Sequence, residues 1–135
     1  MFGRLLHATG QSRAAKTVEI YGWLIFAEGI FVFLFPEAVA SRLCFAPLDH
    51  DGLIFLRLVG LLVAGIGMLY FVSGRMNAEG LVFATLLDRP LVPPIMAGLW
   101  HSGKVSGLLA LVFAAQVLGS FLWTLGTWRG DIRRE

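Results

Sequence analysis

The chain has 135 residues, of which 57% are hydrophobic and 15% are charged, and its mean hydropathy is +0.76. Soluble domains carry about 25% charged residues, so this composition excludes a soluble globular domain and predicts one membrane domain over residues 1–135. The net charge of +2 is too small to indicate a nucleic-acid-binding protein. Cys44 stands alone, which excludes an intramolecular disulfide and a CxxC redox pair.

Residues 1–16 mix apolar and basic side chains on different sides of a helical projection, as in a helix that lies in the headgroup layer. Gly10 and the shortness of the segment favour a flexible lead-in instead, and both interpretations stay open. A basic start followed by an apolar run is also typical of a signal peptide. Because Glu28 interrupts that run, we expect the segment to be retained.

Four apolar stretches approach the roughly 20 residues that a helix needs to cross a bilayer. They cover residues 18–35, 53–72, 81–100 and 105–127. Their connections are short, which makes successive helices antiparallel neighbours. The predicted fold is an all-α integral membrane protein with four transmembrane helices in an up-down bundle. Pro90, Pro93 and Pro94 each remove a backbone donor, so we expect the third helix to be kinked there.

Basic residues indicate how the chain is oriented. If the N-terminus is cytoplasmic, the inner side collects seven of them: Arg4, Arg13, Lys16, Arg75, Arg129, Arg133 and Arg134. The outer side then holds Arg42 and Lys104. Cytoplasmic loops carry the excess of lysine and arginine, so we expect both termini in the cytoplasm. Aromatic residues expected near the inner face fit an interfacial belt: Tyr21, Trp23, Tyr70, Trp123 and Trp128.

Four ionisable residues fall within the spans: Glu28, Arg57, Asp88 and Arg89. Charged groups inside a bilayer need partners or a function, so we expect a shared charge network. The helical rise places Glu28 about 15 Å and Arg89 about 12 Å from the inner face, which makes them the expected ion pair. Arg57 shares a face with small residues and is expected to point into the bundle. Asp88 either joins the network or stays protonated.

Small residues at helical spacing indicate close packing of membrane helices. They are Gly60, Ala64 and Gly67 in the second span, and Gly107, Ala110 and Ala114 in the fourth. Another face of the fourth span carries the polar residues Gln116, Ser120, Thr124 and Thr127. Two such faces favour a homo-oligomer or a partner membrane subunit. Alternatively, the hydroxyl groups bond only to carbonyl groups of their own helix.

The chain has no glycine-rich phosphate loop, no GxSxG nucleophile and no HExxH helix, so we expect neither a catalytic site nor a cofactor. His50 and His101 are weak candidates for metal ligands in the outer loops. No ligand spacing brings them together, and we therefore expect no metal site.

Short motifs mark the first three spans. They are Phe35-Pro36-Glu37, Arg57-Leu58-Val59-Gly60, Gly67-Met68-Leu69-Tyr70 and an arginine, Arg89, early in the third span. This layout resembles small bacterial four-helix membrane proteins of the DoxX-like type. The resemblance implies a bacterial inner (cytoplasmic) membrane, and some members are linked to quinone-coupled sulfur oxidation, which implies contact with lipid or a quinone. The chain lacks paired redox cysteines, so no redox role passes to any residue here.

These features favour a non-catalytic accessory or structural subunit that packs in a homo-oligomer or a larger membrane complex. The alternative is a small transporter or proton-relay protein that uses Glu28, Asp88 and Arg89. A third interpretation is a membrane protein that handles a quinone or a lipid. A dry, neutral charge network would favour the first hypothesis, and a water-filled lumen the second.

Overall fold

The computed structural model describes residues 10–132, and all regular structure in that range is helical. In chain order the elements are α2 (Arg13–Leu34), α3 (Pro36–Arg42), α4 (His50–Arg75), α5 (Glu79–Asp88), the 3-10 helix η1 (Arg89–Leu91), α6 (Val92–His101) and α7 (Gly107–Ile132). The helix or lead-in predicted for residues 1–16 falls largely outside the described residues.

Four helical segments are long and apolar enough to cross a membrane, which confirms that part of the predicted fold. They are Arg13–Leu34, His50–Arg75, Glu79–His101 and Gly107–Gly130. The first two begin earlier than the apolar runs because a polar residue caps each one. The Ser12 side chain accepts a hydrogen bond from the Ala15 backbone, and Asp49 accepts one of 2.8 Å from Gly52.

α2 and α4 form a tight pair whose backbones touch. A methyl group added at Gly29 would collide with the Ala64 backbone, and one added at Gly67 would collide with the Phe26 backbone. Gly60, Gly67 and Gly74 recur every seven residues, which keeps them on one face over two helical turns each. Small residues of this kind let membrane helices approach closely. The α2–α4 pair is therefore the best-packed part of the molecule.

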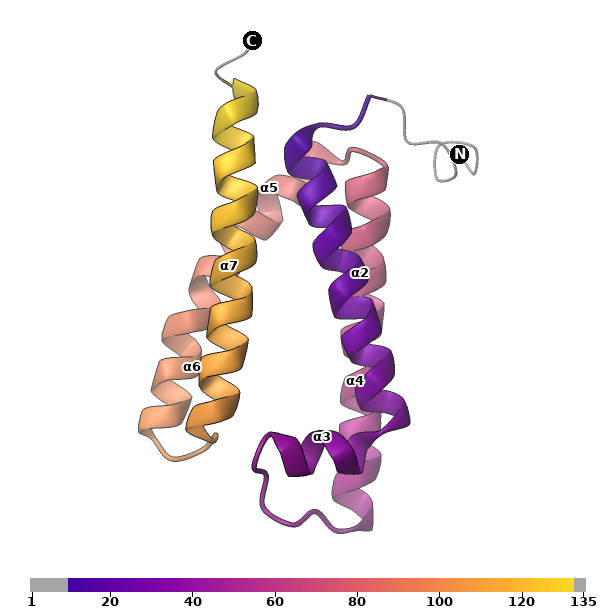
Figure 1. Cartoon of the computed structure of the whole chain (residues 1–135), viewed down its shortest axis with the longest axis vertical. Helices are drawn as coiled ribbons and strands as arrows, with labels where there is room; N and C mark the ends of the chain where they lie inside the picture. The colour runs from indigo at the N-terminus through magenta and orange to yellow at the C-terminus, as the bar shows by residue number, and fades with distance from the viewer. Residues whose placement is uncertain (1–9, 133–135) are drawn as a thin grey trace.

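α6 and α7 form a second pair, which meets the first along α2 and α7. α5 contacts α2, α4 and α7, and so connects the two pairs at one end of the molecule (Figure 1). Toward the other end, where α3 lies, the pairs diverge (Figure 1).

The short helix α3 is absent from the sequence-based prediction, which treated residues 36–52 as a connection. Pro36 begins it, Glu37 lies in its first turn and Arg42 in its last. A proline at the start and charges that complement the helix dipole are standard helix signals. A search for apolar runs of about 20 residues does not detect these signals, because α3 is too short to span a membrane. The Ser106 hydroxyl donates to the Leu43 carbonyl and thus ties the end of α3 to the segment before α7.

Candidate functional site

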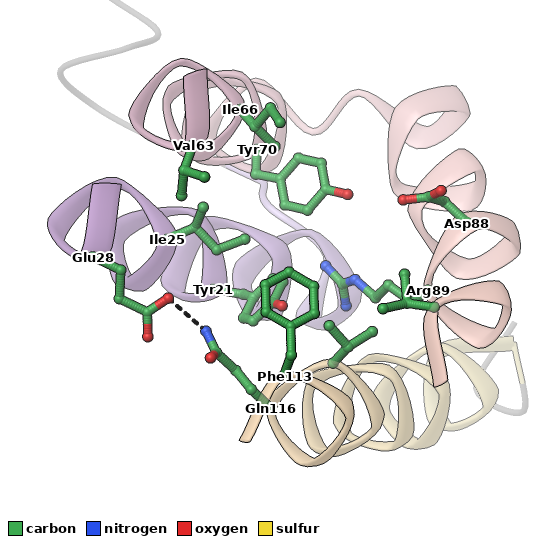
Figure 2. Close-up of a pocket in the computed structure, with 12 residues that line it drawn as sticks. Tyr21, Ile25, Glu28, Val63, Ile66, Tyr70, Asp88, Arg89, Phe113 and Gln116 are labelled. Atoms are coloured by element: carbon green, nitrogen blue, oxygen red, sulfur yellow. Dashed lines mark hydrogen bonds between the residues drawn. The ribbon is translucent and has the colours of Figure 1, made fainter. Parts of the chain in front are cut away.

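A cavity of about 160 Å³ lies between the two helix pairs, beside the 3-10 helix η1. Its lining comes from every span (Figure 2): Tyr21, Ile25 and Glu28 of α2; Val63, Ile66 and Tyr70 of α4; Asp88, Arg89 and Val92 of the third span; and Phe113, Gln116 and Val117 of α7. Most of these side chains are apolar. The cavity therefore combines an apolar wall with three ionisable groups.

Arg89 is placed at the cavity by an interruption in the third span. An α-helix would need the N–H of residue 93 to reach the Arg89 carbonyl, but Pro93 has none. The Val92 N–H donates to the Arg89 carbonyl instead, which closes a 3-10 turn between α5 and α6. This turn carries the Arg89 side chain into the interior, where the residue is only 2% exposed.

One side of the Arg89 guanidinium is held by α7. Its Nη1 donates to the Thr124 hydroxyl at 2.8 Å and to the Ser120 carbonyl at 3.2 Å. The hydroxyl groups of Thr124 and Thr17 are also hydrogen-bonded at 3.0 Å, so Thr124 connects Arg89 to α2. These bonds fix the position of the guanidinium in a medium where an unpaired polar group is costly.

Two tyrosine rings face the same guanidinium. The Arg89 carbon Cζ lies 4.6 Å from the Tyr21 ring centroid and 5.5 Å from that of Tyr70. Both distances are within the range of a cation–π interaction. The Nε and Nη2 atoms of Arg89 are buried and have no hydrogen-bond partner among the described residues. The Tyr70 side chain and the charge of Asp88 also favour the positive charge of Arg89.

Glu28 lies at the other side of the cavity and has a partner of its own. The Gln116 Nε2 donates to the Glu28 Oε2 at 2.7 Å, which joins α7 to α2 (Figure 2). A carboxylate has about four lone-pair sites, so this one bond leaves Glu28 able to accept more. Tyr21 and Glu28 are seven residues apart on α2, which corresponds to about 10.5 Å along the helix.

Asp88 lines the cavity beside Arg89 but is exposed, and no described side chain or backbone group forms a hydrogen bond with its carboxylate. The cavity thus gathers three of the four residues of the predicted network: Glu28, Asp88 and Arg89. No ion pair joins them in the described part of the chain. The ion pair that the structure does record there joins Arg75, at the end of α4, to Glu19 near the start of α2, at 3.1 Å.

Arg57 departs from its expected position. It is exposed and does not line the cavity, so the prediction that it points into the bundle is wrong. The small-residue face of α4 does pack on α2 as far as Gly60, where an added carbon would meet the Phe33 backbone near the end of α2. Arg57 lies one turn beyond that point, where α2 has ended and offers no surface to cover it.

The faces of α7 find their neighbours within the chain. Gly107 lies against the Trp100 side chain of α6, Ala110 is buried and Ala114 is half-buried. On the polar face, Ser120 and Thr124 are buried. Packing of α7 against a second copy or a partner subunit stays a prediction.

Sequence reasoning missed three of the residues that shape the cavity. The sequence predicts Tyr21 and Tyr70 in an interfacial belt, yet Tyr21 is only 7% exposed and both rings face Arg89. Gln116 was assigned to a polar face with no partner named. A signal was present for Glu28 and Gln116, because both are polar residues inside apolar spans and such residues tend to meet.

His50 and His101 are exposed, and the described residues hold no group of three or more His, Cys, Asp or Glu side chains that could bind a metal ion.

Comparison with known proteins adds no relative. The chain matches no family model, no curated protein and no solved structure. The cavity is therefore the feature from which a function can be inferred.

Proposed function

We propose that this chain is a multi-pass membrane protein whose cavity binds a small molecule through a hydrogen-bond-accepting group held by Arg89. The observation that carries the proposal is the guanidinium, which is 2% exposed and keeps Nε and Nη2 without a partner. A buried charge without a full set of partners costs several kcal/mol. Because both atoms are closed off by the side chains around them, an acceptor on a ligand, such as a carboxylate, would reach them only after those side chains move, and would then pair with them in the side-on geometry that arginine favours.

The same geometry argues against a purely architectural charge network. Such a network would pair Arg89 with an acid, and the two acids that share its cavity do not bond to it. Glu28 is instead held by Gln116 across the gap between α2 and α7. Polar residues that leave an open cavity between them suit binding better than mere assembly. Packing against a homo-oligomer or a partner subunit remains a separate prediction.

We infer in addition that the four spans alternate in direction and that the third bends at Arg89–Leu91. The positive-inside bias supports an orientation with both termini in the cytoplasm. The DoxX-like motifs support a bacterial inner membrane. Membership in that family, and contact with a quinone or lipid, are proposals that rest on those short motifs alone.

Transport of the bound molecule is the second candidate function. The two helix pairs are joined at separate levels by single hydrogen bonds, namely Thr17–Thr124, Glu28–Gln116 and Ser106 to the Leu43 carbonyl. A tightly packed α2–α4 pair that is loosely bonded to α7 suits a rocking motion around a central site. Flux into proteoliposomes that Arg89→Gln abolishes would favour transport over simple binding.

The test of binding is native mass spectrometry of the full chain released from a mild detergent. We expect the wild type to carry a bound small molecule, and Arg89→Gln to lose it. Arg57→Gln is the matched control, because it makes the same chemical change in a span but outside the cavity, and it should keep the adduct. An adduct of equal abundance on wild type and Arg89→Gln would contradict the proposal.

A further inference from the structure

The charged groups that the cavity leaves accessible are both acids. Arg89 lines the cavity but is enclosed, with an exposed fraction of 2%. The Glu28 carboxylate is only partly buried, and its Oε1 has no hydrogen-bond partner among the described residues. Asp88 is exposed and lines the cavity on the opposite side from Glu28 (Figure 2). A molecule that enters without moving side chains therefore meets carboxylates and no free guanidinium N–H group.

The sum of the charges in the lining also favours a cation. When ionised, Glu28 and Asp88 contribute one negative charge each and Arg89 contributes one positive charge, so the lining holds one negative charge in excess. An unbalanced charge is costly in a low-dielectric medium. A bound molecule with one positive charge brings the sum to zero, whereas an anion adds to the imbalance.

An aromatic ring borders the same part of the cavity as the Glu28 carboxylate. Gln116 on α7 donates to Glu28 at 2.7 Å, and Phe113 lies one turn earlier on α7 and also lines the cavity (Figure 2). Residues three apart on a helix are neighbours on its surface. An ammonium group placed there gains a charge-assisted hydrogen bond to the carboxylate and a cation–π contact with the ring.

One side of the cavity opens between α4 and the α6–α7 pair. Within residues 10–132, α4 packs on α2 and reaches the third span at α5, but it has no packed interface with α6 or α7. Ile66 of α4 and Phe113 of α7 line the cavity and are 48% and 45% exposed. Both residues lie well inside helices that can cross a membrane, so this opening faces acyl chains. A molecule reaches it by dissolving in the bilayer first.

The volume limits how much of such a molecule is enclosed. An apolar cavity of about 150 Å³ takes up one benzene molecule, and this cavity measures about 160 Å³. It therefore has room for an ammonium group and a single ring. A longer apolar part would extend through the open side into the bilayer.

We propose that the cavity binds a membrane-soluble organic cation, with its ammonium group on the Glu28 carboxylate and its apolar body toward Phe113 and the bilayer. Gln116 orients the carboxylate that receives the ammonium group. The contact uses none of the enclosed N–H groups of Arg89, so this inference goes beyond the proposed function and does not depend on it.

Three probes of nearly one shape but different charge test the inference. They are 4-butylbenzylamine, which is a cation, 4-butylbenzyl alcohol, which is neutral, and 4-butylbenzoate, which is an anion. Isothermal titration calorimetry on the full chain in phosphatidylcholine nanodiscs gives the affinities, with empty nanodiscs as the blank because all three probes enter lipid. We expect the amine to saturate and to bind about tenfold or more tightly than the alcohol, and the benzoate to bind least. Equal affinities of the amine and the alcohol would overturn the proposal.

Two matched variants locate the site. Glu28→Gln removes the charge but keeps a side-chain oxygen for Gln116. The affinity of the amine should then fall to that of the alcohol, and an unchanged affinity of the alcohol shows that the cavity is intact. Glu37→Gln makes the same change on the exposed side of α3 and should alter neither affinity. An amine that binds Glu28→Gln as tightly as wild type would contradict the site.

The same titrations separate this inference from the proposed function. If the benzoate binds most tightly and Arg89→Gln abolishes its binding, the cation site fails while the proposed function stands. If the amine binds through Glu28 and no acceptor-bearing molecule is lost in Arg89→Gln, the cation site stands and the proposed function fails.

Discussion

Gln116 on α7 donates a 2.7 Å hydrogen bond to Glu28 on α2. The sequence predicts an ion pair between Glu28 and Arg89. The structure instead gives the Glu28 carboxylate an uncharged partner. The guanidinium is consequently held by Ser120, Thr124 and two tyrosine rings instead of by an acid. The cavity between the two groups exists because they do not meet.

A double-mutant cycle measures this bond. Glu28→Leu and Gln116→Leu should show a coupling of about 0.6–1.7 kcal/mol, the range for polar pairs between membrane helices. The free energy of unfolding in mixed micelles with a rising fraction of dodecyl sulfate gives the values. The charge swap of Glu28→Arg with Arg89→Glu should not recover stability lost in the single variants. Recovery would mean that the two charges pair directly.

The Thr124 hydroxyl is predicted to matter more than that of Thr127 on the same helix. Thr124→Val removes an acceptor from Arg89 and the partner of Thr17, which should lower the unfolding free energy by about 1–3 kcal/mol. The Thr127 hydroxyl bonds to carbonyl groups of its own helix, so Thr127→Val should stay within about 0.5 kcal/mol of wild type. Equal losses at both positions, measured by the same unfolding assay, would contradict the placement of Arg89.

Adding a single methyl group at the contact between α2 and α4 is predicted to destabilise the protein. Gly29→Ala places a carbon atom against the Ala64 backbone, which cannot move aside as a flexible side chain can. We expect a loss of about 1–3 kcal/mol or more. Gly65→Ala is the matched control on α4, because its added carbon meets nothing within 4 Å. A stable Gly29→Ala protein in thermal melts would place the helix contact elsewhere.

Cys44 offers a test of orientation. It is the single cysteine of the chain and is exposed in the connection between α3 and α4. With both termini in the cytoplasm, a membrane-impermeant maleimide should label Cys44 on intact cells. Gly80→Cys in a Cys44→Ser background puts the thiol at an open position on the other side, and it should react only after the membrane is permeabilised. The reverse pattern would invert the orientation.

The membrane class and the four spans follow from apolar runs alone, because crossing a bilayer requires about 20 such residues wherever they occur. The 3-10 turn at Arg89–Leu91 has a local cause in Pro93, whereas the kink expected at Pro90, Pro93 and Pro94 stays a prediction. The prediction for Arg57 failed for a different reason. Helical periodicity shows which face of α4 carries Arg57, but it does not show where the neighbouring helix α2 ends.

Partners of the buried charges were beyond sequence reasoning. Depth counting placed Glu28 and Arg89 at similar levels, and both do line one cavity. Equal depth in the membrane does not show that two side chains are neighbours within the bundle, however. A side-chain amide on α7 or a tyrosine ring on α2 can lie where an oppositely charged side chain is expected. Tyr21 resembled an interfacial residue because its position along the chain fits a belt, whereas its direction depends on how α2 is rotated against α4.

The central claim is that Arg89 holds an acceptor supplied by a bound molecule. An experimental map of the full chain in lipid nanodiscs, at a resolution that separates side chains, tests it most directly. The account predicts non-protein density larger than a water molecule against Nε and Nη2 of Arg89, with Gln116 still bonded to Glu28. A carboxylate of Glu28 or Asp88 seated directly on the guanidinium, with no space left between them, would contradict it.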